Sequence, residues 1–240
     1  MKAEGRNAVT EALRSGVTVD KLLAAKDLND AGAKRILALA RESRVKTQFV
    51  ERKVLDTQSE SGGHQGFIAY VTEFQYCEIE DILADAEAKG QLPLIIILDG
   101  VEDPHNLGSV LRVAECGGAH GVIIGKHRAC GVNDTVLRIS AGAAEHVKVA
   151  RVTNVNDAID FLKKRGVWVY AAELNGQDIY KTDLNRALAL VVGGEDSGVK
   201  RLTREKCDGV VTLPIFGKVN SLNASVACGI VLYEAIRQRK

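Results

Sequence analysis

The stretch LIIILDGVEDPHNLGSVLRVAECGGAHGVIIG, residues 94–125, decides the fold of this 240-residue chain. Its two ends, 94–98 and 121–125, are short apolar runs rich in β-branched residues, a pattern typical of strands. Between them, behind Pro104, apolar side chains recur at helical spacing over 106–116. Strands that are apolar throughout, separated by a helix, indicate a parallel sheet that is covered on both faces.

Four further apolar runs follow this stretch, with helical patterns between most of them. The runs cover 146–150, 167–171, 188–192 and 209–213. The helical patterns cover 133–140, 155–165, 198–206 and 221–238. This alternation of strands and helices predicts one α/β domain over residues 93–240, built on a parallel sheet.

Residues 1–72 have a different pattern, which predicts a smaller α/β domain. The expected helices cover 5–16, with Gly16 as the stop signal, and 30–43, with Asp30 as the N-cap, and a helical turn covers 52–57. The expected strands cover 19–25, 47–50 and 67–71, the last of them after a glycine-rich loop at 62–66. Residues 73–92 are expected to form an acidic connector that includes a helix.

The net charge of +1 is unevenly distributed along the chain. Residues 1–72 hold 12 basic and 9 acidic side chains, residues 73–90 hold 1 and 6, and residues 91–240 hold 19 and 16. Residues 1–72 and 91–240 are therefore mildly basic, which is compatible with an RNA partner, although ordinary solvated domains carry such charges too. Apolar runs stay well below the ~18 residues of a membrane span, and the polar N-terminus lacks the apolar core of a signal peptide, so we expect a cytoplasmic protein.

Several functional classes lack their sequence signals. The five cysteines form no C-x-x-C pair, and the five histidines show no H-x-x-H or H-x-x-x-H spacing, so we expect neither a disulfide framework nor a metal site. No G-x-G-x-x-G follows a strand, which leaves a dinucleotide-dependent oxidoreductase as a remote alternative. P-loop and G-x-S-x-G motifs are also absent from the sequence.

Three segments place polar residues and glycines where a predicted strand ends and a helix begins, which is where ligands bind in open α/β sheets. In the first, residues 98–118, Asn106 is a candidate helix cap. Arg112 follows in the same segment, and it would either offer a fork of donors to a phosphate or simply be a solvated side chain.

The second segment, residues 190–199, ends a buried strand in Gly193 and Gly194, which would let backbone amides approach a ligand closely. Glu195 follows them, either as part of a site or as an acid that complements a helix dipole.

The third segment, residues 213–239, opens its helix with Ser221 and Asn223, two polar residues where one cap would suffice.

Taken in order, the three segments resemble the three motifs of the SpoU (TrmH-like) family of RNA 2'-O-ribose methyltransferases, within the SPOUT superfamily. DPHNLGSVLRVAECGG resembles the first motif, LVVGGEDSG the second and LPIFGKVNSLNASVACGIVLYE the third. GRNAVTEALRSG and GGHQGFIAYV, near the N-terminus, are similar to the substrate-binding domain of some members, which is related to ribosomal protein L30e. Within the family, the whole chain is most similar to the bacterial enzymes that methylate a guanosine ribose in 23S rRNA.

The resemblance implies a C-terminal SPOUT domain with a trefoil knot, a small N-terminal L30e-like α/β domain, S-adenosylmethionine as the cofactor, structured RNA as the substrate, and a homodimer. The residues it implies for cofactor binding are Gly193, Gly194, Leu213, Ile215 and Leu222. The catalytic residues it implies are Asn106, Arg112, Glu195, Ser221 and Asn223. Asp196 stands where the family more often has glycine and receives no implied role. For the N-terminal domain, the expected RNA contacts are Arg6, Asn7, His64 and Gln65.

Arginine keeps its proton up to a pH above ~12, which makes Arg112 a poor general base. We therefore expect Arg112 to bind the neighbouring phosphate and stabilise the developing alkoxide, while phosphate or water takes the proton. Glu195 is expected either to hold Arg112 in an ion pair or to support the knot. Two alternatives keep the same fold: a tRNA 2'-O-ribose methyltransferase, and a non-catalytic RNA-binding or ribosome-assembly protein.

Overall fold

The structure, a computed structural model, describes residues 1–14, 17–195, 198–219 and 221–240. The chain divides into two units, one made of Met1–Gln75 with Val132–Asp134, the other of Tyr76–Gly131 with Thr135–Lys240. Gly16, the expected stop of the first helix, and Asp196 lie outside the described residues. The first unit ends its main segment at Gln75, within the range 73–92 that was expected to form a connector, and the helix expected in that range belongs to the second unit.

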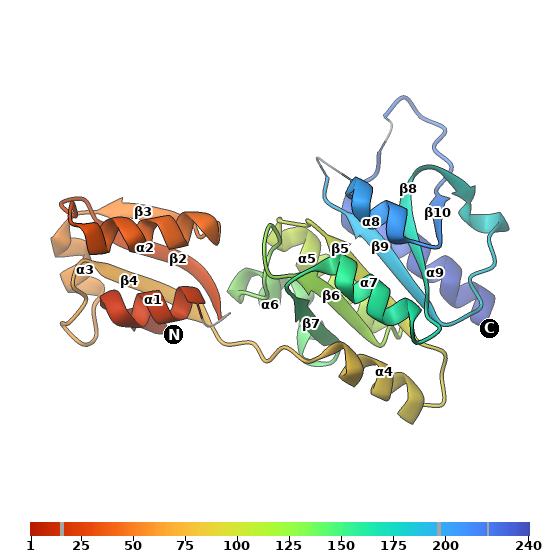
Figure 1. Ribbon diagram of the computed structural model, residues 1–240, viewed down its shortest axis with the longest axis horizontal. Coiled ribbons are helices and arrows are strands. Elements are labelled where there is room, and N and C mark those ends of the chain that lie inside the picture. The colour runs from red at the N-terminus through yellow and green to blue at the C-terminus, as the bar shows by residue number, and fades with distance from the viewer. Residues whose placement is uncertain (15–16, 196–197, 220) are drawn as a thin grey trace. The chain divides into compact units, whose positions relative to one another are not determined.

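Figure 1 shows the arrangement of strands and helices in the first unit. Among its described residues, this unit has a four-stranded sheet and three helices. Its strands are β1 (Lys2–Glu4), β2 (Thr18–Ala25), β3 (Thr47–Val50) and β4 (Phe67–Thr72), in the order β1-β4-β2-β3. Its helices are α1 (Arg6–Arg14), α2 (Ala31–Glu42) and α3 (Arg52–Gln58). Only β2 and β3 pair in parallel among these strands. Strand β1, three residues long, is the element that the sequence pattern did not predict.

Alternate residues of this sheet serve two small cores. Leu22 and Phe67 pack with Ile36 and the other apolar residues of α1 and α2. Leu23 and Ile68, one position along their strands, belong to a second cluster with Leu55 of α3. The two-residue period of a strand thus places helices on both faces of this sheet.

The second unit is built on a six-stranded sheet in which every neighbouring pair is parallel. Its strands are β5 (Leu94–Asp99), β6 (Gly121–Gly125), β7 (Lys148–Val152), β8 (Trp168–Asp178), β9 (Leu188–Gly193) and β10 (Gly209–Thr212). Their order is β10-β8-β9-β5-β6-β7. The predicted parallel α/β domain is therefore confirmed, although β7 begins two residues later than predicted and β8 continues well past residue 171.

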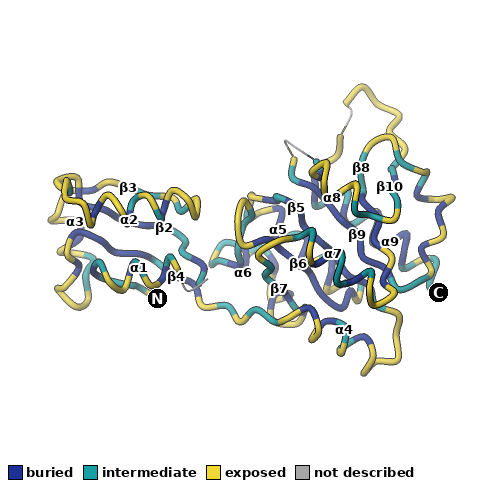
Figure 2. Tube along the Cα trace, in the orientation of Figure 1, coloured by how far each residue is buried: buried dark blue, intermediate teal, exposed yellow. Residues whose placement is uncertain are grey.

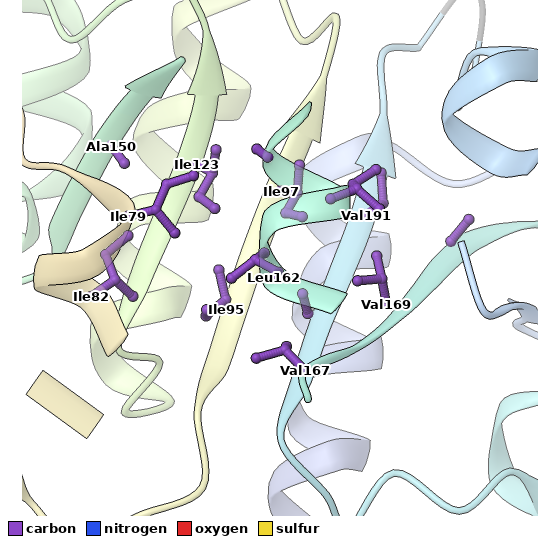
Figure 3. Close-up of a cluster of buried hydrophobic side chains, with 14 of the residues drawn as sticks. Ile79, Ile82, Ile95, Ile97, Ile123, Ala150, Leu162, Val167, Val169 and Val191 are labelled. Carbon is purple, nitrogen blue, oxygen red and sulfur yellow. The ribbon is translucent and has the colours of Figure 1, made fainter. Parts of the chain in front are cut away.

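Helices cover both faces of this sheet. They are α4 (Ile79–Ala88), α5 (Pro104–Cys116), α6 (Asp134–Ser140), α7 (Val155–Lys163), α8 (Arg201–Lys206) and α9 (Ala224–Arg239), with short 3-10 turns η1 (Ala143–Glu145) and η2 (Ile179–Lys181). Ile95 and Ile97 of β5 face the core formed with α4 and α7 (Figure 3). On the other face α9 packs against α5, β8 and β9. Strands β5, β6 and β9 are consequently buried along their whole length (Figure 2).

The strand order brings β10, β8, β9 and β5 side by side, so the segments that leave their carboxyl ends meet at one edge of the sheet. Every helix among the described residues is too short or too polar to span a bilayer.

A buried histidine links the beginnings of two central strands. His120 is 3 % exposed, its Nδ1 accepts a hydrogen bond from the Leu94 N–H at 3.0 Å, and its Nε2 lies 3.0 Å from Gln91 Oε1. Burial, with nearby Lys89, lowers the pKa of His120 below its ordinary value of 6.5. The unfolded chain then binds this proton more readily than the folded chain does, so stability is complete above pH 6.5 and decreases as the pH falls through 6.5.

We therefore expect the His120→Gln variant to lose less stability than the wild type between pH 7.5 and pH 5.5. At pH 7.5 the substitution should lower the free energy of unfolding by about 1 kcal/mol, the contribution of an ordinary hydrogen bond. Trp168, the single tryptophan, lies in the same unit and can report urea unfolding by fluorescence. Equal pH dependence in the two proteins would contradict the assignment.

Candidate active site

A cavity of about 390 Å³ opens at the carboxyl edge of the large sheet. The middle of β8, the ends of β9 and β10 and the start of α9 form its walls. All five residues expected to hold a cofactor line it, together with two of the expected catalytic residues: Gly193, Gly194, Leu213, Ile215, Leu222, Glu195 and Ser221. Three chain segments that are far apart in the sequence thus contribute to one cavity.

A hydrogen-bonded cluster joins three of the expected catalytic residues at this cavity. Asn223 Nδ2 donates to Asn106 Oδ1 at 2.9 Å and also to Glu195 Oε1. Asn106 Nδ2 donates to the same Glu195 oxygen at 3.1 Å. One carboxylate oxygen therefore orients two amides, each from a different segment.

Asn106 is available for this cluster because another residue caps its helix. The N-cap of α5 is Asp103, whose Oδ1 accepts from the His105 N–H at 2.9 Å, and Pro104 occupies the first helical position. The predicted cap at Asn106 is therefore wrong: this residue lies within the first turn and is 5 % exposed. Its buried amide instead satisfies its hydrogen-bonding capacity in the cluster.

Asn223 both caps a helix and takes part in the hydrogen-bonded cluster. It is the N-cap of α9, and its Oδ1 accepts from the N–H groups of Ser225 at 3.0 Å and Val226 at 3.3 Å. Its Nδ2 remains free to donate to Asn106 and Glu195. The start of the last helix and the polar cluster are consequently fixed by one side chain.

The turn after β9 approaches its neighbours too closely to carry side chains. A Cβ on Gly193 would lie 2.0 Å from the carbonyl carbon of Gly198, and one on Gly194 would lie 2.5 Å from the Gly100 oxygen. Buried Asp99 anchors the same region, since Lys200 donates to it from the backbone N–H at 3.0 Å and from Nζ at 2.6 Å. These contacts hold the cavity wall, and with it Glu195, against the end of β5.

Arg112 is the expected catalytic residue that neither joins the cluster nor is among the described residues that line the cavity. It is exposed, on the second half of α5. Among the described residues, Glu195 binds the two asparagine amides, and no hydrogen bond or ion pair joins it to Arg112. The expected ion pair between the two side chains is therefore absent from this arrangement.

In the first unit, the residues expected to contact RNA come from two segments that are far apart in the sequence, and a hydrogen bond joins the two segments. The Arg6 N–H donates to Gln65 Oε1 at 3.2 Å, and Asn7 and Gln65 are exposed. The Arg6 guanidinium forms a two-pronged ion pair with Asp30, with both distances 2.7 Å. His64 differs from these residues, as it is 5 % exposed.

Both ring nitrogens of His64 are engaged: Nδ1 accepts from the Gly66 N–H at 3.0 Å, and Nε2 lies 2.9 Å from Asp56 Oδ1. This arrangement gives His64 a role in holding the loop at 62–66. An RNA contact from its ring is accordingly not part of our proposal.

Sequence reasoning missed Glu173, Asp99 and Lys200. Glu173 lines the cavity, but the strand that carries it was predicted to end at residue 171. The signal that could have found Asp99 is an acid that directly follows an apolar strand. Lys200 offers no such signal, because only the fold brings it to Asp99.

The fold and the site together define an α/β enzyme domain accompanied by a separate small domain, and the comparisons with known proteins identify both. The description "SpoU rRNA Methylase family" matches residues 93–233, and "RNA 2'-O ribose methyltransferase substrate binding" matches residues 2–77. The chain belongs to the SpoU family of RNA methyltransferases, which use S-adenosylmethionine.

Similar proteins agree over nearly the full length. A Bacillus subtilis protein, YacO, named as a TrmH family tRNA/rRNA methyltransferase, is 44 % identical and aligns with 98 % of this chain and 94 % of its own. The structure of the SpoU methyltransferase AviRb from Streptomyces viridochromogenes, with bound AdoMet, covers 100 % of this chain and 90 % of that one, at 26 % identity and a TM-score of 0.64. The AdoMet-bound rRNA methyltransferase from Sinorhizobium meliloti covers 98 % and 86 %, at 26 % identity and a TM-score of 0.62.

The double role of Asn223 leads to a prediction. Asn223→Asp keeps an oxygen that caps α9, but it sets a second carboxylate against Glu195 in place of an amide donor. We expect the α9 cap to persist, the two carboxylates to lower the stability by repelling each other, and methyl transfer to fall roughly 10²-fold, the usual cost of removing one preorganised donor. Thermal unfolding and transfer of a labelled methyl group to RNA measure the two effects.

Asn154→Asp is the matched control, because Asn154 caps α7 in the same way, through the Asn156 N–H at 3.0 Å, and does not line the cavity. Full methyl transfer by the Asn223 variant would refute the role of the cluster.

Proposed function

We propose that the protein transfers the methyl group of S-adenosylmethionine to a ribose 2'-hydroxyl of RNA, and that its substrate is a guanosine of 23S rRNA. The observation that carries the proposal is the cluster of Asn106, Glu195 and Asn223 beside a cavity of cofactor size. A protein that only bound RNA would need neither the cavity nor a buried asparagine aimed at an acid. An RNA of this kind is met in the cytoplasm, where we place the reaction.

The cavity fits the cofactor in size and in chemistry. Leu213, Ile215 and Leu222 supply apolar surface for the adenine, and backbone groups near Gly193 can bind its polar edge. No lysine, arginine or histidine is among the described lining residues, while Glu173 and Glu195 are, which suits a ligand that carries two positive groups. When bound, the cofactor supplies an electrophilic methyl group on a sulfonium.

The residues of the chain then have to place a ribose hydroxyl in line with that methyl group. Asn106 and Asn223, held by Glu195, present amide groups beside the cavity that can orient the ribose. Ser221, exposed at the cavity wall, can accept or donate a further hydrogen bond. Because hydrogen bonds within the chain fix the two amides, they need little reorganisation when substrate binds.

Arg112 has the properties of a phosphate ligand. It is exposed and lies on the same helix as Asn106, and a guanidinium matches the two oxygens of a phosphate. We assign to it the phosphate next to the target ribose and the stabilisation of the developing alkoxide, with phosphate or water taking the proton. Its separation from Glu195 supports this role, because its charge is left for the substrate.

The first unit supplies a surface for structured RNA in this proposal. Asn7 and Gln65 are exposed next to Arg6, and side chains of this kind contact phosphates, 2'-hydroxyls and unpaired bases. The trefoil knot belongs to the proposal as well, and the close backbone contacts at Gly193 and Gly194 support it. The name of the Bacillus relative covers both tRNA and rRNA, so tRNA is the second candidate substrate.

The central test compares wild-type protein with Arg112→Lys on 23S rRNA fragments and on tRNA. We expect the wild type to transfer a labelled methyl group, and the methylated site to resist alkaline cleavage, because that cleavage requires a free 2'-hydroxyl. Arg112→Lys should lose roughly 10²-fold in transfer, since an ammonium cannot replace the planar fork. Its affinity for S-adenosylmethionine should stay unchanged.

Arg201→Lys is the matched control, on an exposed arginine of the same unit that pairs with Glu205. If the Arg112 variant transferred methyl groups as well as the wild type, the proposed need for a planar guanidinium would be refuted. If only tRNA were methylated, tRNA would be the substrate in place of 23S rRNA. RNA binding without any transfer would favour a non-catalytic assembly protein.

A homodimer completes the proposal, and an apolar stripe on α9 supports it. Val226, Ile230 and Tyr233 follow one another at helical spacing and are 50 %, 37 % and 50 % exposed. Leu222, 44 % exposed at the cavity, continues the stripe. A second copy that covers this face would bury the apolar side chains close to the cofactor cavity.

We expect light scattering to give twice the mass of the chain for the wild type. Tyr233→Glu should shift the protein toward the monomer, because a carboxylate in an apolar interface would be desolvated without a partner. Leu202→Glu, on α8, is the control, as Leu202 is equally exposed but lies outside the stripe. A monomeric wild type, or a dimer that Tyr233→Glu leaves intact, would rule out this interface.

A further inference from the structure

Glu173 is a charged residue of the cavity that takes no part in placing the target ribose. It lies in β8, next to Ala172, which pairs with Val192 of β9, and its side chain lines the cavity. The carboxylate is held in place, because Oε2 accepts from the Val199 N–H at 3.1 Å. Gly198 makes room for it: a Cβ there would lie 2.7 Å from the same oxygen, and its φ is +59°.

These contacts leave part of the hydrogen-bonding capacity of the Glu173 carboxylate unused. Oε1 receives only a long contact from the Leu174 N–H, at 3.4 Å, among the described residues. No cation pairs with Glu173 in the described part of the chain. A ligand that fills the cavity removes water from this oxygen, and a desolvated carboxylate without donors is costly. The ligand must therefore offer hydrogen-bond donors at this point.

The order of the strands indicates which part of the cofactor lies there. Along the sheet edge the order is β10, β8, β9, β5. Leu213 and Ile215, proposed to hold the adenine, follow β10, whereas Glu195 and Asn106 of the catalytic cluster follow β9 and β5. Between adenine and sulfur the cofactor has its ribose, and between β10 and β9 the sheet has β8 with Glu173.

We infer that Glu173 accepts hydrogen bonds from the 2'- and 3'-hydroxyls of the cofactor's ribose and so selects a ribonucleoside. The arrangement has a physical precedent in dinucleotide-binding folds, where glycines end one parallel strand and an acid at the end of a neighbouring strand binds the ribose diol. Here Gly193 ends β9 and Gly194 follows it, and the acid lies within β8, beside the residue that pairs with β9. The inference rests on the proposed cofactor site.

The test measures whether the loss of affinity caused by removing a ribose hydroxyl from the ligand depends on Glu173. Full-length wild type, Glu173→Gln and Glu173→Ala are titrated calorimetrically with 5'-methylthioadenosine and with its 2'-deoxy and 3'-deoxy analogues. In the wild type, each missing hydroxyl should weaken binding roughly tenfold or more, as expected for a hydrogen bond to a charged group. In Glu173→Ala the same deletions should change the affinity less than twofold, and Glu173→Gln should lie between the two.

The coupling separates ligand contact from a merely structural role. If Glu173 served only to hold the Val199 N–H, the variants would bind all three ligands more weakly, but the hydroxyl penalty would persist unchanged, and the inference would be overturned. An unaltered affinity for 5'-methylthioadenosine in both variants, with weaker binding of S-adenosylmethionine, would move the contact to the methionyl part and also overturn it. Glu205→Gln, an acid on α8 that pairs with Arg201, is the control and should behave as the wild type.

The titrations of the wild type distinguish a failure of the proposed cofactor site from a failure of the role assigned to Glu173. If it binds neither S-adenosylmethionine nor 5'-methylthioadenosine, the proposed cofactor site itself fails. If it binds both and tolerates the deoxy analogues, the site stands and the role of Glu173 is wrong. Should Glu173→Ala not fold, Glu173→Gln still decides, because it keeps an oxygen for the Val199 N–H and removes the charge.

Discussion

The close approach of three backbone segments at the end of β9 is the constraint on which the site depends. Gly193 and Gly194 touch Gly198 and Gly100 at distances that admit no side chain. The Gly194 N–H donates to the backbone carbonyl oxygen of Asp99 at 3.2 Å, and the Asp99 carboxylate binds Lys200. This crossing fixes the direction in which the chain leaves β9, and therefore the place of Glu195. It also sets Gly198 against β8, where Glu173 needs it. Any residue larger than glycine would have to move the cavity wall.

The sequence predicted the large sheet well because burial on both faces leaves a direct trace, namely unbroken runs such as 94–98 and 188–192. Prediction from the sequence was less accurate for elements that depend on contacts between residues far apart in the chain. Strand β1 has only three residues and pairs with β4 from the other end of the unit, so no local pattern reveals it. Strand β8 continues to Asp178 because β10 pairs beside it, although most of the residues after 172 are polar.

The candidate site shows the same division between local and distant information. Local signals were enough to select the glycines, Glu195, Ser221 and Asn223, and the resemblance placed them in one family. Which donor would satisfy Glu195 was not predictable, because it depends on how α5 begins. Asp103 takes the cap and Pro104 the first position, so Asn106 turns toward the acid while Arg112, six residues later, does not. The expected ion pair failed for a geometric reason rather than an electrostatic one.

That outcome makes chemical sense in a site that handles charges of both signs. A guanidinium bound to Glu195 would be neutralised, and a substrate phosphate would have to compete with the carboxylate for it. Two neutral amides satisfy the acid without consuming a cation. The acids then remain on the cavity side, where the proposed cofactor brings positive charge, and the charge of Arg112 is left for the phosphate that we propose it binds. Because Asn223 also caps α9, the part of the chain proposed to meet the second subunit begins at the same side chain that orders the cluster. Assembly of the dimer would thus stabilise the catalytic arrangement directly, through the start of that helix.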